Sequence, residues 1–184
     1  MNSIKNHILI AMPHMDSHYF KESVIFMCEH NNDGAMGLIV NKPLDDQILE
    51  KVLVQLNVNS NETFQPFSDI YFGGPVMFDR GILLHKYQIE LYESVKLSDN
   101  FYLSSDKKAF KSIAENPDNK SRFFLGHSGW SNGQLESEIE NGDWIVQETS
   151  PEFIFDVPED KMWIMALQSF GIEISNFSTF GGKA

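Results

Sequence analysis

One glycine-rich stretch in the second half of the chain predicts a strand, a tight turn, a helix and a second strand in close succession. Residues 122–126 (RFFLG) form a short apolar run that ends in glycine, which is typical of a buried strand that stops where the backbone turns. Ser131 and Gln134 then have the spacing of a capping box, in which two side chains satisfy free amides at a helix start. We therefore predict a helix from about Asn132, followed by a strand at residues 143–148 (DWIVQE).

The rest of the chain alternates between short apolar runs and turn signals. Residues 31–34 (NNDG) separate two such runs and predict a hairpin, and Gly37 in the second run indicates a bulge or a close backbone approach. Strands are predicted at residues 8–12, 23–28, 35–40, 69–72, 80–87 and 101–103, a short strand or extended piece at 152–156, helices at about 45–56, 105–115 and 156–170, an exposed loop at 57–68 and a tail at 172–184. Early hairpins and a later strand-helix-strand unit predict an α+β fold with a mixed sheet and helices on its faces.

The acidic composition limits the partners that this chain can bind. A length of 184 residues suits one compact domain, which we expect at residues 1–184. Asp and Glu number 26 against 14 Lys and Arg, which gives a net charge of -12 at pH 7. Such a surface repels phosphate backbones and anionic lipids, and the sequence holds no Lys/Arg cluster that would overcome this repulsion. We therefore expect neither nucleic-acid binding nor membrane binding.

Cysteine usage and hydropathy indicate a cytoplasmic protein. Cys28 is the only cysteine, so an internal disulfide is impossible and the count suits a reducing compartment. The N-terminal apolar run is too short for a secretory signal, and no run approaches membrane-spanning length. We expect Cys28 to be a buried, inert thiol.

Glycines and polar side chains gather at the predicted strand ends, which suggests a ligand pocket. Gly73 and Gly74 directly follow a strand and would let bare backbone approach a small ligand. The seven residues expected to frame this pocket are Asn41, Gly73, Gly74, His85, Gly126, Trp130 and Gln134. The alternative is that these glycines only allow tight turns. The run at 73–76 (GGPV) is not a phosphate-binding loop, because it lacks the longer glycine spacing and the Lys-Ser/Thr ending of that motif.

A catalytic role would depend on Ser128, which lies between two glycines after a predicted strand. A nucleophile elbow needs glycine two residues before and two residues after the serine, and Trp130 occupies the second place. His85 and His127 are the available bases. A hydrolase or transferase that uses His85 with Ser128 or a bound water is therefore an alternative, not the first hypothesis.

No metal and no other cofactor are expected. His14 and His18 have the spacing of two ligands on a helix, with Asp16 between them. A zinc site of this kind needs a third ligand, and a zinc protease also needs the glutamate of HExxH, which this segment lacks. His30, just past a strand end, is expected to be a turn residue.

Several motifs spread along nearly the whole chain together resemble one protein family. The motifs are residues 10–13 (IAMP), Asp16, Phe20, 28–30 (CEH), 34–43 (GAMGLIVNKP), 73–76 (GGPV), 84–85 (LH), 125–130 (LGHSGW), 133–136 (GQLE), Glu138, Ile139, Trp144, Trp163 and 171–172 (GI). On these residues the chain resembles the AlgH/YqgE family of bacterial proteins, whose molecular activity is not established. The resemblance implies an α+β fold with a mixed, partly closed (barrel-like) β-sheet flanked by helices. One departure is His127-Ser128, where a Tyr-Ala-like pair is expected, and this departure weakens a catalytic role for Ser128.

Three functions compete on this sequence. The first is a non-enzymatic regulatory module that binds an unknown small molecule or protein partner in the predicted pocket. The second is the hydrolase or transferase that uses His85. The third is a direct DNA-binding regulator, because the family takes its name from a proposed role in transcriptional control of alginate production. The net charge disfavours this third function, and no basic recognition helix is visible in the sequence.

Overall fold

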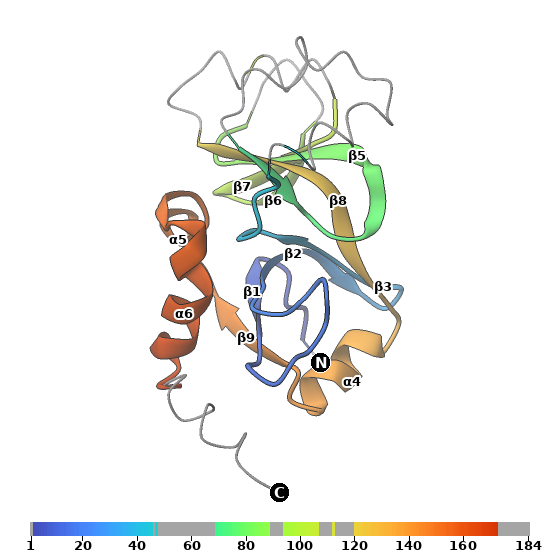
Figure 1. Ribbon diagram of the computed structural model, residues 1–184. Helices are drawn as coiled ribbons and strands as arrows, with labels where there is room; N and C mark the ends of the chain where they lie inside the picture. The colour runs from blue at the N-terminus through green and yellow to red at the C-terminus, as the bar shows by residue number, and fades with distance from the viewer. Residues whose placement is uncertain are drawn as a thin grey trace, which may run out of the picture.

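The computed structural model describes residues 2–45, 47, 69–88, 94–106, 112 and 120–172. The described residues form a nine-stranded, curled sheet with three helices, an α+β fold as predicted (Figure 1). The elements are β1 (His7–Ala11), β2 (Val24–Asn31), β3 (Gly34–Ile39), β4 (Ile70–Phe72), β5 (Val76–His85), β6 (Val95–Ser98), β7 (Phe101–Ser104), β8 (Ser121–Ser131), α4 (Gln134–Glu140), β9 (Trp144–Glu148), α5 (Pro151–Asp156) and α6 (Glu159–Ser169). The predicted helices at 45–56 and 105–115, the loop at 57–68 and the tail at 172–184 lie almost wholly outside the described residues.

The sheet is mixed, as predicted, but almost entirely antiparallel. Its strands follow the order β6-β7-β5-β8-β3-β2-β1-β9, and β4 pairs with β8 in parallel outside this path. The predicted hairpin is confirmed, because β2 and β3 pair antiparallel around a turn that joins Asn31 to Gly34. The predicted close backbone approach at Gly37 is also confirmed: a Cβ there would lie 3.0 Å from the Phe26 carbonyl oxygen and 2.6 Å from Ile25 Cγ2. The bulge of this pair falls on β2, between Met27 and Glu29.

Strand β8 is the longest strand and runs straight through the predicted glycine turn, so the turn prediction was wrong. Its first half pairs with β5 and β4, and its second half pairs with β3 from Ser128 to Ser131. Gly126 lies where the partners change, with a left-handed φ of 69°. Neighbours on both edges hydrogen-bond the backbone there, so the glycine bends the strand without ending it.

Helix α4 begins later than predicted. It starts at Gln134 behind an N-cap glycine, Gly133, which has φ 76°. The capping box forms only by half: Gln134 Oε1 accepts from the Ser131 N–H (3.1 Å), but the Ser131 hydroxyl donates to the same oxygen instead of capping the helix (3.1 Å). A Gln side chain that reaches back is therefore the part of the motif that the fold uses.

The predicted strand or extended piece at residues 152–156 is instead helix α5. Pro151 occupies its first turn, and the hydroxyl of the N-cap residue Ser150 accepts from the Phe153 N–H at 3.3 Å. The Ser-Pro pair is a helix-start signal that outweighs the β-propensity of EFIFD. Helix α6 follows as predicted and buries Met162, Trp163, Ala166 and Leu167.

Helices α5 and α6 cover one face of the curled sheet, and α4 with several aromatic residues covers the other. The first hydrophobic core lies between the sheet and helices α5 and α6, on the left in Figure 1. The second core, around Phe20, Trp130 and Trp144, lies on the side of α4. In the part of the chain that the structure describes, no helix is long and apolar enough to cross a membrane.

Candidate functional site

Three of the predicted pocket residues, Gly73, Gly74 and Gly126, meet at one backbone crossing. The Gly73 N–H donates to the Leu125 carbonyl (2.9 Å), and the Gly73 carbonyl accepts from the Ile39 N–H (3.0 Å). A Cβ on Gly73 would lie 2.2 Å from the Gly126 carbonyl oxygen, and one on Gly126 would lie 2.4 Å from that of Gly74. The glycines bring bare backbone against backbone, where no side chain fits. Their hydrogen bonds and close contacts join β3, β4 and β8.

His85 is sealed in the core at the far end of β5. Its Nδ1 lies 2.7 Å from the Tyr87 carbonyl oxygen, which can only accept, so Nδ1 carries the proton. Its Nε2 then accepts from the Ser104 hydroxyl at 3.0 Å. Burial lowers the pKa of His85, which favours the neutral ring. Ser128 lies elsewhere and donates to the Gly73 carbonyl (3.3 Å), so the predicted pair of His85 and Ser128 does not form.

Trp130 and Gln134 meet at a residue that the sequence analysis missed, Glu138. Both indole N–H groups of Trp130 and Trp144 donate to Glu138 Oε2, each at 2.8 Å, and Gln134 Nε2 donates to Glu138 Oε1 at 3.0 Å. Gln134 and Glu138 are spaced i, i+4 and therefore share a helix face. This spacing is the signal that could have identified the pair. Glu138 thus fixes α4 to both tryptophans, and the cluster is structural.

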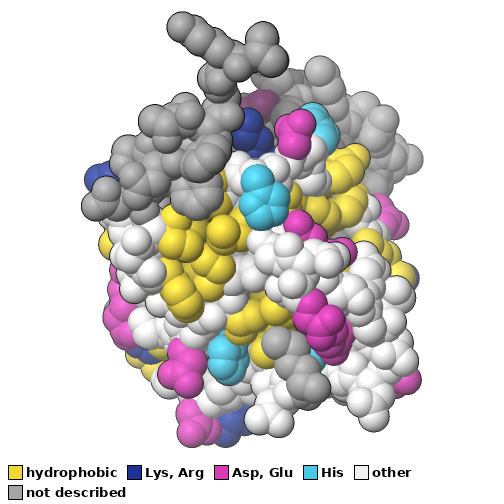
Figure 2. All heavy atoms as spheres, turned by 90° about the horizontal axis from the view of Figure 1, so that it is seen from below, with side chains coloured by type: hydrophobic (Ala, Val, Ile, Leu, Met, Phe, Trp, Pro, Cys, Tyr) yellow, Lys and Arg dark blue, Asp and Glu magenta, His cyan; other side chains and the backbone are white. Residues whose placement is uncertain are grey.

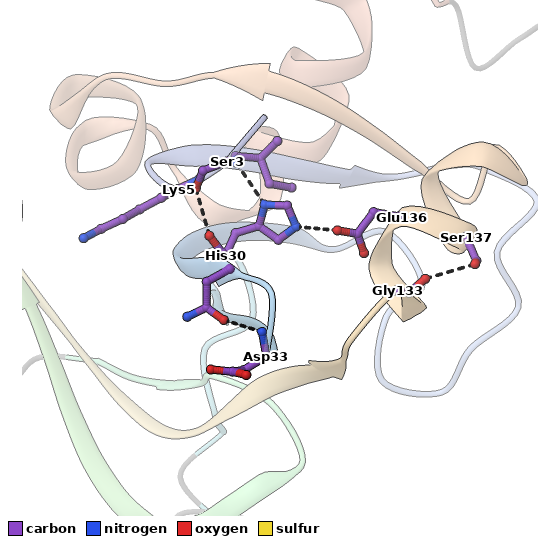
Figure 3. Close-up of polar contacts among 9 residues, drawn as sticks. Ser3, Lys5, His30, Asp33, Gly133, Glu136 and Ser137 are labelled. Carbon is purple, nitrogen blue, oxygen red and sulfur yellow. Dashed lines mark hydrogen bonds and ion pairs between the residues drawn. The ribbon is translucent and has the colours of Figure 1, made fainter. Parts of the chain in front are cut away.

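His30 is not a simple turn residue, because its ring links the N-terminal segment to α4 (Figure 3). The Ile4 N–H donates to His30 Nδ1 (3.2 Å), so Nε2 carries the proton and donates to Glu136 Oε1 (2.9 Å). The Glu136 backbone N–H and His30 together lower the pKa of the Glu136 carboxyl. The contact ties the first residues of the chain to the start of α4.

The remaining predicted residue, Asn41, opens onto a polar depression of about 370 Å³. The depression lies between the loop that precedes β2, the end of β3 and the first turn of α6. Its described lining consists of His18, Lys21, Glu22, Asn41, Lys42, Glu159, Asp160 and Trp163, and we call it the Asn41 hollow. It combines cationic, anionic and aromatic side chains in one concave place and is therefore more polar than most small-molecule sites, which are mainly apolar.

Asn41 holds one wall of the hollow in a strained conformation. Its Nδ2 donates to the Glu22 carbonyl (2.9 Å), and its Oδ1 accepts from the Val24 N–H (2.8 Å). Between these contacts Glu22 has a left-handed φ of 56°, which costs a non-glycine residue about 1–2 kcal/mol. Strain of this kind persists where the surroundings impose it, and it is frequent at ligand sites.

Lys42 supplies the most distinctive charge in the hollow. Its Nζ donates to the Tyr19 carbonyl oxygen at 2.8 Å. Burial lowers the pKa of Lys42, and the nearby Glu22 offsets only part of that shift. Within the described ranges, no carboxylate lies within ion-pair distance, 4.0 Å, of this ammonium. The hollow therefore presents a half-buried cation that has Glu22 nearby but no described carboxylate within ion-pair distance.

The wall on α6 is held by a buried cluster behind it. Glu159 accepts from the Tyr71 hydroxyl and forms an ion pair with Arg122 at 3.1 Å. Arg122 is only 5% exposed, donates to the carbonyls of Val40 and Val157, and stacks on the Tyr71 ring at 4.8 Å. Burial alone would raise the pKa of Glu159, but hydrogen bonds from Tyr71 and its own backbone, with the charge of Arg122, hold it below its usual value.

This cluster predicts a pH dependence of stability. Because the folded-state pKa of Glu159 is depressed, its contribution is complete above the unfolded value near 4.5 and is lost as the pH falls through the folded pKa. The gap in melting temperature between wild type and Glu159→Gln should therefore narrow between about pH 5 and pH 3. Glu140→Gln, at an exposed helix position, is the control. A gap that stays constant over this range would contradict the assignment.

His14 and His18, which have the spacing of two metal ligands, lie in different surroundings. His14 Nε2 lies 3.5 Å from Asp143 Oδ1 at the surface, while His18 lies in the lining of the Asn41 hollow. In the described segments, no group of three His, Cys, Asp or Glu side chains is placed to hold a metal ion.

Comparison with known proteins now identifies the relatives of this fold. A family model described as AlgH-like matches residues 8–175. The chain belongs to the AlgH-like family. UPF0301 proteins of Pseudoalteromonas translucida and Shewanella frigidimarina are 38% and 39% identical to it, over the full length of both chains in each pair. The solution structure of AlgH from Pseudomonas aeruginosa has a TM-score of 0.74 at 34% identity and covers 100% of this chain and 97% of its own. A crystal structure from Corynebacterium diphtheriae, 23% identical with a TM-score of 0.67, covers 92% of this chain and 88% of its own and shares the fold.

Three of the residues that carry the resemblance to the AlgH-like family lie in the Asn41 hollow: Asn41, Lys42 and Trp163. Trp163 is anchored there by its indole N–H, which donates to the Ala11 carbonyl at 2.7 Å. Of these three residues, only Asn41 is among the seven that the sequence predicts to frame a pocket. The Asn-Lys pair after an apolar strand is the signal that could have added Lys42.

The structure divides the seven predicted pocket residues among separate places, so they do not line one pocket. His85 pairs with Ser121 at one end of β8, and Trp130 pairs with Ala35 near the other end. Ser121 and Trp130 are nine positions apart on β8, and an extended strand of that length spans up to roughly 30 Å. The glycine crossing lies between these two ends, and Asn41 opens onto the hollow.

Proposed function

We propose that this member of the AlgH-like family is a non-enzymatic module that binds a small polar molecule in the Asn41 hollow and regulates a partner through that binding. The observation that carries the proposal is Lys42, a half-buried ammonium with no described carboxylate within 4.0 Å. A partly desolvated charge without a contacting counterion is unfavourable, and an anionic group of a bound ligand would relieve that cost. We place this role in the cytoplasm, because a single cysteine suits a reducing compartment.

The side chains at hand support binding better than catalysis. The described lining of the hollow includes no Ser, Thr or Cys that could act as a nucleophile. The one described pairing of a serine with a histidine base, Ser104 with His85, is 3% and 0% exposed, so a substrate has no access to it in this conformation. A hydrolase or transferase that uses His85 is therefore disfavoured.

Thermal-shift measurements with small polar metabolites test the proposal. A ligand at about 100 times its Kd should stabilise the wild type by about 2.7 kcal/mol. Lys42→Met should lose most of this stabilisation, because the variant removes the charge that the ligand meets. Lys161→Met is the matched control, since Lys161 lies on α6 outside the described lining. Equal stabilisation of wild type and Lys42→Met, or none of the wild type by any metabolite, would contradict the proposal.

A direct DNA-binding role is less compatible with the charges. The described Lys and Arg side chains are scattered on the face drawn in Figure 2, with acidic side chains around them. We expect the protein to pass through a heparin column at low salt, because the net charge is -12. Salt-dependent retention on heparin or duplex DNA would instead support DNA contact. If the protein passes through instead, a transcriptional role would be indirect, through a ligand or a protein partner.

A further inference from the structure

The Asn41 hollow contains side chains of both charges, and the acids of its α6 wall lie on a different segment from the two lysines. Lys21 and Lys42 come from the loop before β2 and from the residues after β3, whereas Asp160 comes from the first turn of α6. We propose that the hollow binds a zwitterion of the amino-acid type, with its carboxylate against Lys42 and its ammonium against Asp160. This inference rests on the proposed binding function and names its ligand class.

The carboxylate end follows from Lys42. Its ammonium already donates to the Tyr19 carbonyl and has further donors for an incoming oxygen. A carboxylate would supply the countercharge that described neighbours do not provide within 4.0 Å, and Lys21 adds a second positive charge nearby. A carboxylate bound to a partly desolvated ammonium makes one of the stronger hydrogen bonds found in proteins.

The ammonium end follows from the acids of the lining: Glu22 adjoins Lys21 on the loop before β2, and Glu159 and Asp160 lie in the first turn of α6. Glu159 is already bound by Tyr71 and Arg122. Asp160 and Glu22 have no cation within ion-pair distance among the described residues. The indole of Trp163 belongs to the same lining and suits a cationic or apolar ligand group.

Ligands of a single charge fit this lining less well. A purely anionic ligand would meet Glu22, Glu159 and Asp160, and a purely cationic one would meet Lys21 and Lys42. A molecule that carries both charges satisfies both sides and avoids both repulsions. The volume, about 370 Å³, lies at the small end of ligand sites, which suits a free amino acid or a very short peptide.

Calorimetric titration of the full chain with the twenty free amino acids, one at a time, tests the inference. The best binder is then compared with its N-acetyl derivative, which lacks the ammonium, and with its amide, which lacks the carboxylate. We expect each derivative to bind at least tenfold more weakly. Lys42→Met should bind the free amino acid and its amide equally, and Asp160→Asn should bind the free amino acid and its N-acetyl derivative equally. Lys161→Met should behave as wild type.

The outcomes separate this inference from the proposed function. If a metabolite of another class binds in a Lys42-dependent manner and no amino acid does, the zwitterion is wrong and the binding function stands. If the derivatives bind as well as the free amino acid, the zwitterion is also wrong. If no small polar molecule of any class binds, both proposals fall. Circular dichroism confirms that each variant folds, and Lys42→Gln replaces Lys42→Met if the latter does not.

Discussion

Replacing Gly126 with alanine is expected to destabilise the fold by about 3–5 kcal/mol, a large share of the stability of an ordinary domain. Two effects add. The left-handed φ of 69° is unfavourable for any residue with a Cβ, and the new methyl group would lie 2.4 Å from the Gly74 carbonyl oxygen. Backbone on both sides leaves this contact no room to relax. Urea denaturation should show a lower midpoint with an unchanged slope.

Gly133→Ala is the matched control for this prediction. Gly133 has nearly the same backbone conformation, φ 76°, but a Cβ there would meet no atom within 4 Å. Gly133→Ala should therefore lower the free energy of unfolding only by the conformational strain, about 1–2 kcal/mol. The difference between the two variants therefore measures the backbone crossing itself. Equal losses would mean that the crossing is looser than these contacts indicate.

Replacing Arg122 with methionine is expected to lower the free energy of unfolding by about 3–5 kcal/mol. The guanidinium is 5% exposed and donates to two backbone carbonyls as well as to Glu159. Methionine fills part of the volume but leaves these acceptors, and a carboxylate, without their partner. Because the cluster positions the first turn of α6, ligand binding at the Asn41 hollow should weaken as well.

Lys120→Met removes the same charge two residues earlier and is the control. Lys120 pairs with Asp156 at the surface, where the two side chains are 46% and 41% exposed. Exposed pairs of this kind contribute about 0–1 kcal/mol. In the double variant Arg122→Met with Glu159→Gln, part of the loss should be recovered, because no carboxylate is left unpaired. A loss at Arg122 no larger than that at Lys120 would contradict the buried-cluster assignment.

The predicted strands are mostly correct because apolar runs report burial directly. The errors occur where one residue type serves two geometries. Gly126 and Gly133 look alike in the sequence, yet the first bends a continuous strand and the second begins a helix. Which role each plays depends on whether neighbouring strands are present to hydrogen-bond the chain, and spacing along the sequence does not contain that information.

The candidate site was harder to predict than the fold for a related reason. The Asn41 hollow combines a loop, a strand end and the start of α6, three segments that lie far apart in the sequence. Nothing local to Lys42 shows that Glu159 and Asp160 will face it. Strand β8 is extended and separates His85, beside one of its ends, from Trp130 near the other, so proximity to strand ends in the sequence does not bring these residues together.

The pairing of β1 with β9 has a consequence for synthesis on the ribosome. His7 of β1 is partnered by Glu148 of β9. Strand β1 is therefore synthesised long before the strand with which it pairs. Until then the nascent chain carries an unprotected edge, which is a template for mispairing with other polypeptides. Contacts this distant along the chain also slow folding. We therefore expect the newly made protein to depend on chaperones more than a local helical bundle of equal length does.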